Sequence, residues 1–191
     1  LVRCFEDWDI THVTASVEPV LEREIIDIAL GLADLASVEK RLDKAARAAR
    51  SGDAQAKTEL KLLEALQPVL ADGRPARAVV PSDEERAAYR SFNLLTSKPV
   101  LYAANVAETE INEGNCFVEA LRQSLERDGE AAEIVTFSAK VEAELAELSP
   151  EDRRDFLESL GLSESGLDRL AHGAYHLLGL QSYFTAGEKE V

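Results

Sequence analysis

Two short polar segments carry residue types that could recognise a ligand, and each follows an apolar run. The first is Asn105-Val106-Ala107-Glu108, after residues 99–104, and the second is Ser138-Ala139-Lys140, after residues 134–137. An Asn amide offers a donor and an acceptor in one plane, and a carboxylate three residues later can accept from an amine. Backbone N–H groups of the second segment can bind the edge of a ring, while the stem of Lys140 covers its face. This chemistry suits a nucleobase.

The two apolar runs predict strands of a parallel sheet, buried on both faces and separated by a helix near 116–127. Ligands of open α/β sheets bind beyond the carboxyl ends of the strands, where turns of neighbouring strands meet. Each segment alone also has a structural interpretation, because Asn forms turns and Ser caps helices. The presence of both segments at consecutive strand ends favours a binding site.

The other elements of this α/β pattern flank the two strands. Further helices are expected from near Lys140, after Ser149-Pro150, and over 164–178. The remaining β-prone segments are residues 1–5, 10–13 and 181–185. The alternation of strands and helices is typical of an α/β fold.

A helical hairpin is predicted between the first strand and the rest of the sheet. Residues 21–50 form a long helix, residues 51–53 a short connection with Gly52 as a C-terminal cap, and a second helix runs to 71. A loop over 72–81 and a short helix from the capping box at 82–85 to about Leu94 complete the segment. The apolar positions predicted to pair along the long helix are Ile25, Ile28, Leu32, Leu35, Leu42, Ala46 and Ala49.

The charge of the chain is strongly acidic but unevenly distributed. The 191 residues include 21 Lys+Arg and 36 Asp+Glu, a formal net charge of −15, which argues against non-specific binding of nucleic acid by the whole surface. Residues 38–62, however, hold seven basic and four acidic side chains. They form either a solvated helix face or a local contact for RNA, and the solvated face is the simpler interpretation.

Several other kinds of site are not expected. The two cysteines, Cys4 and Cys116, lie far apart in the sequence, which predicts neither a disulfide framework nor a zinc cluster, and no segment is apolar enough to span a membrane. His172 and His176 have metal-ligand spacing, but a pair on a helix surface is the better interpretation. His12 is expected to have a structural role at a strand end, and Trp8 a packing role.

Asn-x-x-Glu followed by Ser-Ala-Lys resembles the fourth and fifth nucleotide-binding motifs of the P-loop GTPases. The usual fourth motif there is Asn-Lys-x-Asp, whose Asp accepts two hydrogen bonds from guanine; Val106 and Glu108 replace its Lys and Asp. With these replacements, the motif resembles that of the Obg-like ATPase (YchF) family, which prefers ATP. Segments that also resemble that family, in order, are residues 2–7, 9–13, 32–35, 95–99 and 183–191.

The resemblance implies an α/β fold: a partial P-loop NTPase (GTPase-like) sheet with an inserted antiparallel α-helical hairpin. The implied domains are a nucleotide-domain segment over 1–20, the hairpin insertion and return helix over 21–95, the second half of the nucleotide domain over 96–179, and the start of a truncated TGS domain over 180–191. In the implied site, Phe5 lies against the base ring and the remaining base-binding residues are Asn105, Val106, Glu108, Ser138, Ala139 and Lys140.

The resemblance further implies a cytoplasmic, ribosome-associated protein that hydrolyses ATP with Mg²⁺. We expect a monomer whose contacts with ribosomal RNA are made by Lys40, Lys44, Arg47, Arg50, Lys57 and Lys61. The sequence contains no G-x-x-x-x-G-K-[ST] motif, so the chain alone is expected to be inactive, with the Mg²⁺ ligands in a part preceding Leu1. The alternatives are a GTP-binding protein of the Obg family and a non-enzymatic helical interaction scaffold.

Overall fold

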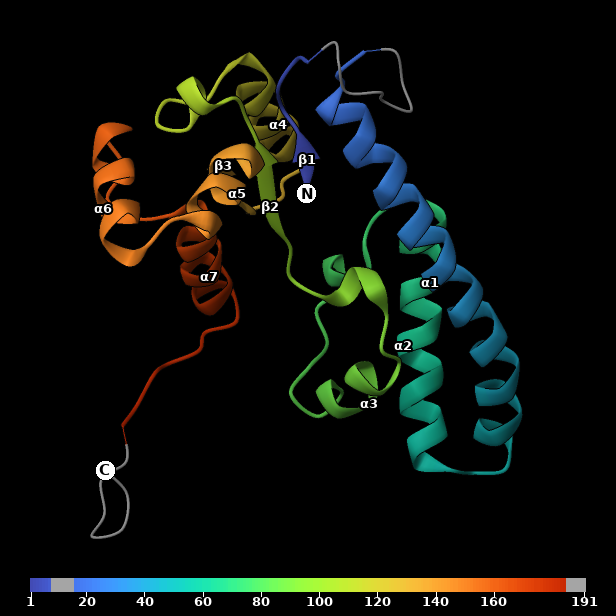
Figure 1. The fold of residues 1–191 in the computed structure, drawn as a ribbon. Coiled ribbons are helices and arrows are strands. Elements are labelled where there is room, and N and C mark those ends of the chain that lie inside the picture. Colours follow the sequence, from blue (N-terminus) through green and yellow to red (C-terminus); the bar gives the residue numbers. More distant parts are fainter. Residues whose placement is uncertain (8–15, 185–191) are drawn as a thin grey trace, which may run out of the picture. The chain divides into compact units, whose positions relative to one another are not determined.

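The computed structural model describes residues 1–7 and 16–184, which belong to two compact units (Figure 1). Residues 1–20 and 100–191 form the first, here called the sheet unit, and residues 21–99 form the second, the hairpin unit. The hairpin unit is therefore an insertion in the sequence of the sheet unit. Each unit is described by itself.

A parallel three-stranded sheet organises the sheet unit. Its strands β1 (Val2–Arg3), β2 (Leu101–Asn105) and β3 (Glu133–Phe137) lie in the order β1-β2-β3. Tyr102 and Ala104 are buried in β2, while the alternate residues of this strand are half-buried. The predicted parallel sheet is confirmed, although burial of β2 on both faces is less complete than expected.

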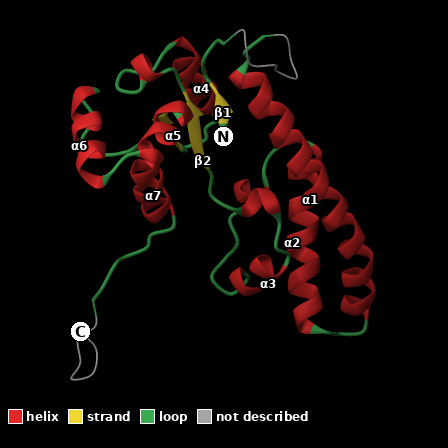
Figure 2. Ribbon diagram, viewed as in Figure 1, coloured by secondary structure: helices red, strands yellow, loops and turns green. Residues whose placement is uncertain are grey.

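The sheet unit also contains the helices α4 (Cys116–Arg127), α5 (Ala139–Glu147), α6 (Pro150–Ser159) and α7 (Gly166–Leu177), which are labelled in Figure 2. The buried residues of α4 lie at helical spacing, and Val118, Leu121 and Leu125 pack into one core with Tyr102 and Ala104. The four predicted helices are confirmed: α4 has the predicted bounds, α5 and α6 begin at Ala139 and Pro150, and both ends of α7 lie within two residues of the predicted 164–178.

The strand predicted at 181–185 is wrong over its described part, because residues 181–184 have no regular structure. The segment predicted at 10–13, together with Trp8, His12 and Thr185, lies outside the described residues. No helix in the described part of the chain is both long enough and apolar enough to cross a membrane.

The hairpin unit confirms the predicted antiparallel pair of helices, α1 (Pro19–Arg50) and α2 (Ala54–Ala71). Gly52 has a φ of +96°, which an L side chain rarely adopts, and it allows the sharp turn between the helices. Buried residues from both helices, including Val38, Leu63 and Leu66, form the core with Phe92.

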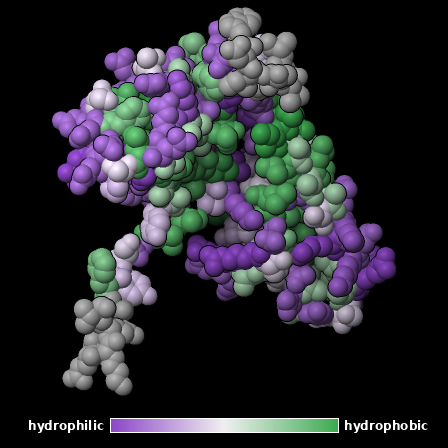
Figure 3. All heavy atoms as spheres, in the orientation of Figure 1, coloured by the Kyte–Doolittle hydropathy of each residue, from purple (hydrophilic) through white to green (hydrophobic). Residues whose placement is uncertain are grey.

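The apolar positions predicted along α1 are only partly correct. Leu35 and Leu42 pack on the core, but Ile25, Ile28 and Leu32 have exposed fractions of 53%, 59% and 61%. These exposed residues give the first half of α1 the apolar surface seen in Figure 3. The physical reason is length: α1 has 32 residues and α2 has 18, so the hairpin core draws on α1 from Leu35 onward.

The return from the hairpin consists of short helical turns. These are η1 (Ala76–Ala78), α3 (Arg86–Ser91) and η2 (Leu95–Ser97). The Glu85 carboxylate accepts from the Ser82 N–H, which is one half of the predicted capping box, but α3 begins only at Arg86, with Glu85 at its N-cap and no side-chain cap. The helix ends at Ser91 rather than near Leu94, because Asn93 adopts a positive φ of 52° that breaks the helix.

Candidate nucleobase site

Three chain segments leave the sheet at its carboxyl edge. Arg3 of β1 is paired with Asn105 of β2, which is in turn paired with Phe137 of β3. The pairing continues one step further, because Cys4 N donates to Asn105 O at 2.8 Å and Val106 N donates to Phe137 O at 2.9 Å. The residues that follow each strand are therefore brought to one edge, as predicted for the second and third strands.

Asn105 joins the two turns that the sequence singled out. Its side-chain Oδ1 accepts a hydrogen bond of 2.9 Å from the backbone N–H of Ala139, the first residue of α5. The amide –NH₂ group of Asn105 has no hydrogen-bond partner among the described residues, so its two donors remain free. Ser138 is buried, whereas Ala139 and Lys140 are exposed at the same turn.

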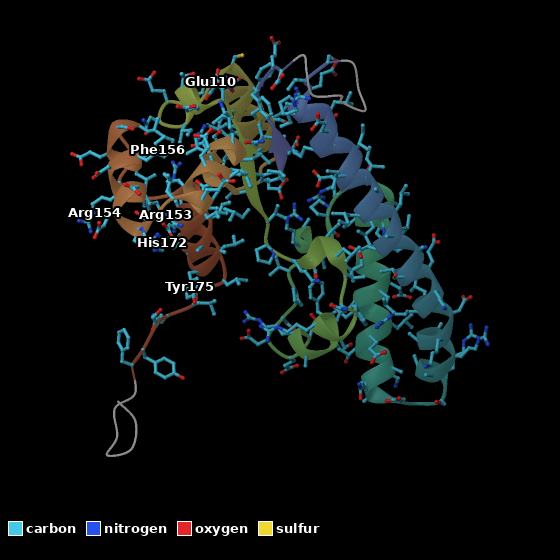
Figure 4. All side chains as sticks on the ribbon, in the orientation of Figure 1. Glu110, Arg153, Arg154, Phe156, His172 and Tyr175 are labelled. Carbon is cyan, nitrogen blue, oxygen red and sulfur yellow. The ribbon has the colours of Figure 1, made fainter. Side chains whose placement is uncertain are left out.

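Two carboxylates in the turn after β2 have different roles. Glu108 begins the short helical turn η3 (Glu108–Glu110) and is half-buried, without a hydrogen bond or ion pair to the rest of the described chain. Glu110, labelled in Figure 4, instead accepts from Asn115 Nδ2 at 2.7 Å and from Ala107 N at 3.2 Å. Glu110 thus stabilises the turn, and Glu108 remains available to a ligand.

Asn115 fixes this turn to its neighbours, a role that the sequence analysis missed. Its Nδ2 donates to Cys4 O at 2.6 Å as well as to Glu110, and its Oδ1 accepts from Phe117 N and Val118 N, both at 3.1 Å. One side chain therefore links the end of β1, the turn after β2 and the start of α4. An Asn directly before a predicted helix is an N-cap signal that could have identified the residue.

Phe5 and Val106 occupy different environments. The Phe5 ring is half-buried, and the Arg3 guanidinium lies 4.8 Å from the ring centroid, while Arg3 Nε donates to Phe5 O at 3.1 Å. The Val106 side chain is 2% exposed and packs in the core of the sheet unit. Only the main chain of Val106 is thus available at this edge.

The basic residues proposed to contact RNA are all exposed on the hairpin. Lys61 differs from the others because its Nζ forms an ion pair of 2.8 Å with Glu85 Oε1. The hydrogen bond with Lys61 is the largest factor that lowers the pKa of Glu85, to about 2, and the same bond raises the pKa of Lys61. Among the described residues, Lys40, Lys44, Arg47, Arg50 and Lys57 have no ion-pair partner.

The histidine pair on α7 faces carboxylates. His172 Nδ1 lies 3.1 Å from Glu164 Oε2, and His176 Nδ1 lies 3.9 Å from Glu133 Oε2. The described residues nevertheless contain no group of three or more His, Cys, Asp or Glu side chains arranged to hold a metal ion.

No family model matches the chain. Curated relatives do: the chain is 44% identical over 193 residues to the "Ribosome-binding ATPase YchF" of Bacillus subtilis, and 42% identical over 191 residues to the protein of that name from Escherichia coli O157:H7. Both matches cover the whole of this chain and 52% of the relative, so the chain spans about half the length of these curated relatives. The solved structure of the Schizosaccharomyces pombe YchF GTPase superposes with a TM-score of 0.84 at 27% identity, over 98% of this chain and 51% of that one.

Proposed function

Because the chain belongs to the YchF family of Obg-like ATPases, we propose that the carboxyl edge of its sheet binds the adenine base of ATP. The protein that carries this chain is then a ribosome-associated, cytoplasmic ATPase. The proposal rests mainly on the hydrogen bond from Ala139 N to Asn105 Oδ1, since this bond orients the Asn105 amide and joins the two turns.

The free polar groups at this edge complement adenine. The adenine ring presents an acceptor, N7, beside a donor, the N6 amine. The free –NH₂ of Asn105 supplies a donor, and the unpartnered Glu108 carboxylate supplies an acceptor. Guanine has a carbonyl oxygen in place of the amine, and a carboxylate facing that oxygen would repel it. This chemistry favours ATP over GTP.

Phe5 is proposed to lie against the face of the base. The ring follows β1 at the same edge, and stacking of a base on an aromatic ring contributes roughly 1–3 kcal/mol. The Arg3 guanidinium over the Phe5 ring holds the ring in place through a cation–π contact.

The residues present fit the base but not the phosphates. The sequence contains no phosphate-binding G-x-x-x-x-G-K-[ST] motif, and the described residues offer no cluster of metal ligands. Bound Mg²⁺ would neutralise charge on the phosphates during hydrolysis. We therefore assign binding of the base, and no step of hydrolysis, to residues of this chain.

The partner proposed for the hairpin unit is ribosomal RNA. The relatives are named ribosome-binding, and five exposed basic side chains on the hairpin have no ion-pair partner in the described structure. Unpaired Lys and Arg side chains are suited to phosphate contacts, whereas Lys61 is already paired with Glu85.

Equilibrium titration of the full-length protein with fluorescent ATP and GTP analogues tests the base site. Replacing Asn105 by Ala or Glu108 by Gln is expected to weaken ATP binding about tenfold or more, since Asn105→Ala removes a donor to the base and Glu108→Gln replaces a charged acceptor by a weaker, neutral one. Glu108→Asp restores the acidic residue of the guanine-binding motif and is expected to reduce the preference for ATP. Glu113→Gln, at an exposed position after the same turn, is the matched control and should bind ATP normally.

Two results would contradict the proposal. Absence of ATP binding in the unmodified protein would favour an interaction scaffold, and a preference for GTP would favour the GTP-binding alternative. Thermal unfolding of each variant distinguishes loss of the base contact from loss of the fold.

A further inference from the structure

A hollow of about 370 Å³ lies between α7 and the outer strand β3, away from the turns that form the nucleobase site. Its walls are residues 133–136 of β3, Glu164, and one side of α7. The α7 residues are Arg169, His172, Gly173 and His176, whose spacing places them on a single helix face. Figure 4 labels His172 on this helix.

Gly173 explains how α7 approaches the sheet at this point. A Cβ atom there would lie 3.4 Å from both Leu101 Cδ1 and Val135 Cγ2, at the short limit of ordinary van der Waals contact. The glycine lets the helix backbone rest on the strands, while the long side chains on either side of Gly173 border the hollow. The hollow is thus a consequence of helix packing within the sheet unit.

Arg169, which borders the hollow, has a guanidinium group in an unusual environment. Among the described residues, its Nε and Nη2 atoms have no hydrogen-bond partner, and both are shielded from solvent, so a ligand reaches them only after neighbouring side chains move. These two nitrogens form one edge of the guanidinium, the edge that binds both oxygens of a carboxylate with parallel hydrogen bonds. A buried guanidinium edge without a partner is unfavourable, so an acidic group that supplies two oxygens there would be bound favourably.

The acidic side chains of the hollow are engaged elsewhere. Glu164 faces His172 and Glu133 faces His176, and neither forms an ion pair with Arg169. The side chains of His172 and His176 are 75% and 89% exposed, so they can change rotamer and admit a ligand.

We propose that this hollow binds a carboxylate, with the Nε–Nη2 edge of Arg169 as the recognising group. A carboxylate carries one negative charge, whereas a phosphate with two charges would be repelled more strongly by Glu133 and Glu164. The carboxylate belongs either to a small organic acid or to an acidic residue of a peptide. The proposal is independent of the base site, because no residue of that site borders the hollow.

NMR detection of the arginine Nε–H groups in the full-length protein tests this assignment. Titration with acetate should shift the Arg169 signal saturably, with an affinity at least tenfold higher than at Arg153 and Arg154, two exposed arginines of α6 that serve as internal controls. Acetamide, which has the same shape and no charge, should give no saturable shift, and inorganic phosphate should bind more weakly than acetate.

Two further measurements identify the source of the carboxylate and distinguish a loss of binding from misfolding. Tighter binding of the peptide acetyl-Gly-Glu-Gly-amide than of acetate would point to a peptide, and equal or weaker binding to a small acid. Arg169→Gln should abolish the acetate-dependent rise in Tm, while Arg154→Gln should retain it.

The proposal is overturned if the Arg169 signal responds to acetate no more than the exposed arginines do, or if acetamide acts as well as acetate. These results leave ATP binding untouched, so the two proposals fail separately.

Discussion

At the residue scale, chemically similar side chains have different roles because their hydrogen-bond partners differ. Glu108 and Glu110 lie two positions apart, yet Glu110 accepts two hydrogen bonds within the turn and Glu108 accepts none from the described chain. A carboxylate whose lone pairs are already used stabilises structure, and one whose lone pairs are free can bind a ligand. The same reasoning separates the paired Lys61 from the other basic residues of the hairpin.

Asn115 is expected to couple stability to the shape of the base site. Asn115→Ala removes the helix cap and both Nδ2 hydrogen bonds, which should lower the free energy of unfolding by about 1–2 kcal/mol and weaken ATP binding. Asn115→Asp keeps the capping oxygen but loses the donors and faces Glu110 with a like charge. ATP titration should therefore show impaired ATP binding in both variants. Urea unfolding should show that the stability contributed by the helix cap is retained only in Asn115→Asp. Unchanged ATP binding in both would show that Asn115 does not hold the turn.

At the scale of elements, a buried carboxylate connects the hairpin to its return segment. Asp34 of α1 is 2% exposed and accepts from Leu95 N, Thr96 N and Thr96 Oγ1 at 2.7, 2.7 and 2.6 Å. Thr96 Oγ1 in turn accepts from Ala76 N at 2.8 Å. This chain of hydrogen bonds ties α1 to η2 and η1, and its members Asp34 and Thr96 lie in two of the segments that resemble the YchF family, 32–35 and 95–99.

Asp34→Ala should destabilise the hairpin unit strongly. The substitution leaves buried N–H groups without acceptors, and we expect the free energy of unfolding to fall by about 2–4 kcal/mol. Urea unfolding measures the loss. Glu39→Ala, at an exposed position of the same helix, is the control and should change stability little. Equal stabilities for the two variants would contradict the role given to Asp34.

The Lys61–Glu85 ion pair predicts a pH dependence of the hairpin unit. The pKa of Glu85 is lowered to about 2 by its hydrogen bonds, so its contribution to stability is fully present above the ordinary Glu pKa of about 4.3 and is lost as the pH falls toward 2. Unfolding measured between pH 5 and 2 should show a smaller pH dependence in Glu85→Gln than in the unmodified protein. The Lys61 side chain is 77% exposed, so the effect should be modest and should decrease with salt. Identical pH profiles for the two proteins would exclude this contribution.

At the scale of the whole molecule, net charge and local charge have opposite signs. The formal net charge is −15, yet the hairpin carries exposed basic side chains that are free of ion pairs in the described structure. Repulsion between an acidic protein and RNA would suppress binding elsewhere and favour contact through the hairpin. In the proposed contact with ribosomal RNA, charge distribution would then determine which surface of the protein faces the RNA.

Reversal of the hairpin charges tests this orientation. Replacing both Lys44 and Arg47 by Glu should reduce co-sedimentation of the full-length protein with ribosomes, and most clearly at low salt, because phosphate contacts depend on counterion release. The matched control replaces Arg153 and Arg154 of α6 by Glu and changes the net charge equally. Equal co-sedimentation of both variants with the unmodified protein would remove the hairpin from the proposed contact.

The sequence by itself determined the local features of this protein: the parallel strands, the helices, the hairpin, and the two polar turns at Asn105 and Ser138. These features follow from periodicity, caps and turn residues, which act over a few neighbouring positions. Only the tertiary structure decided which half of α1 is buried, that Asn105 accepts from Ala139, that Asn115 rather than a motif residue fixes the turn, and that Nε and Nη2 of Arg169 lack a hydrogen-bond partner among the described residues. These outcomes depend on contacts between residues far apart in the chain, and no local pattern encodes which distant group a side chain meets.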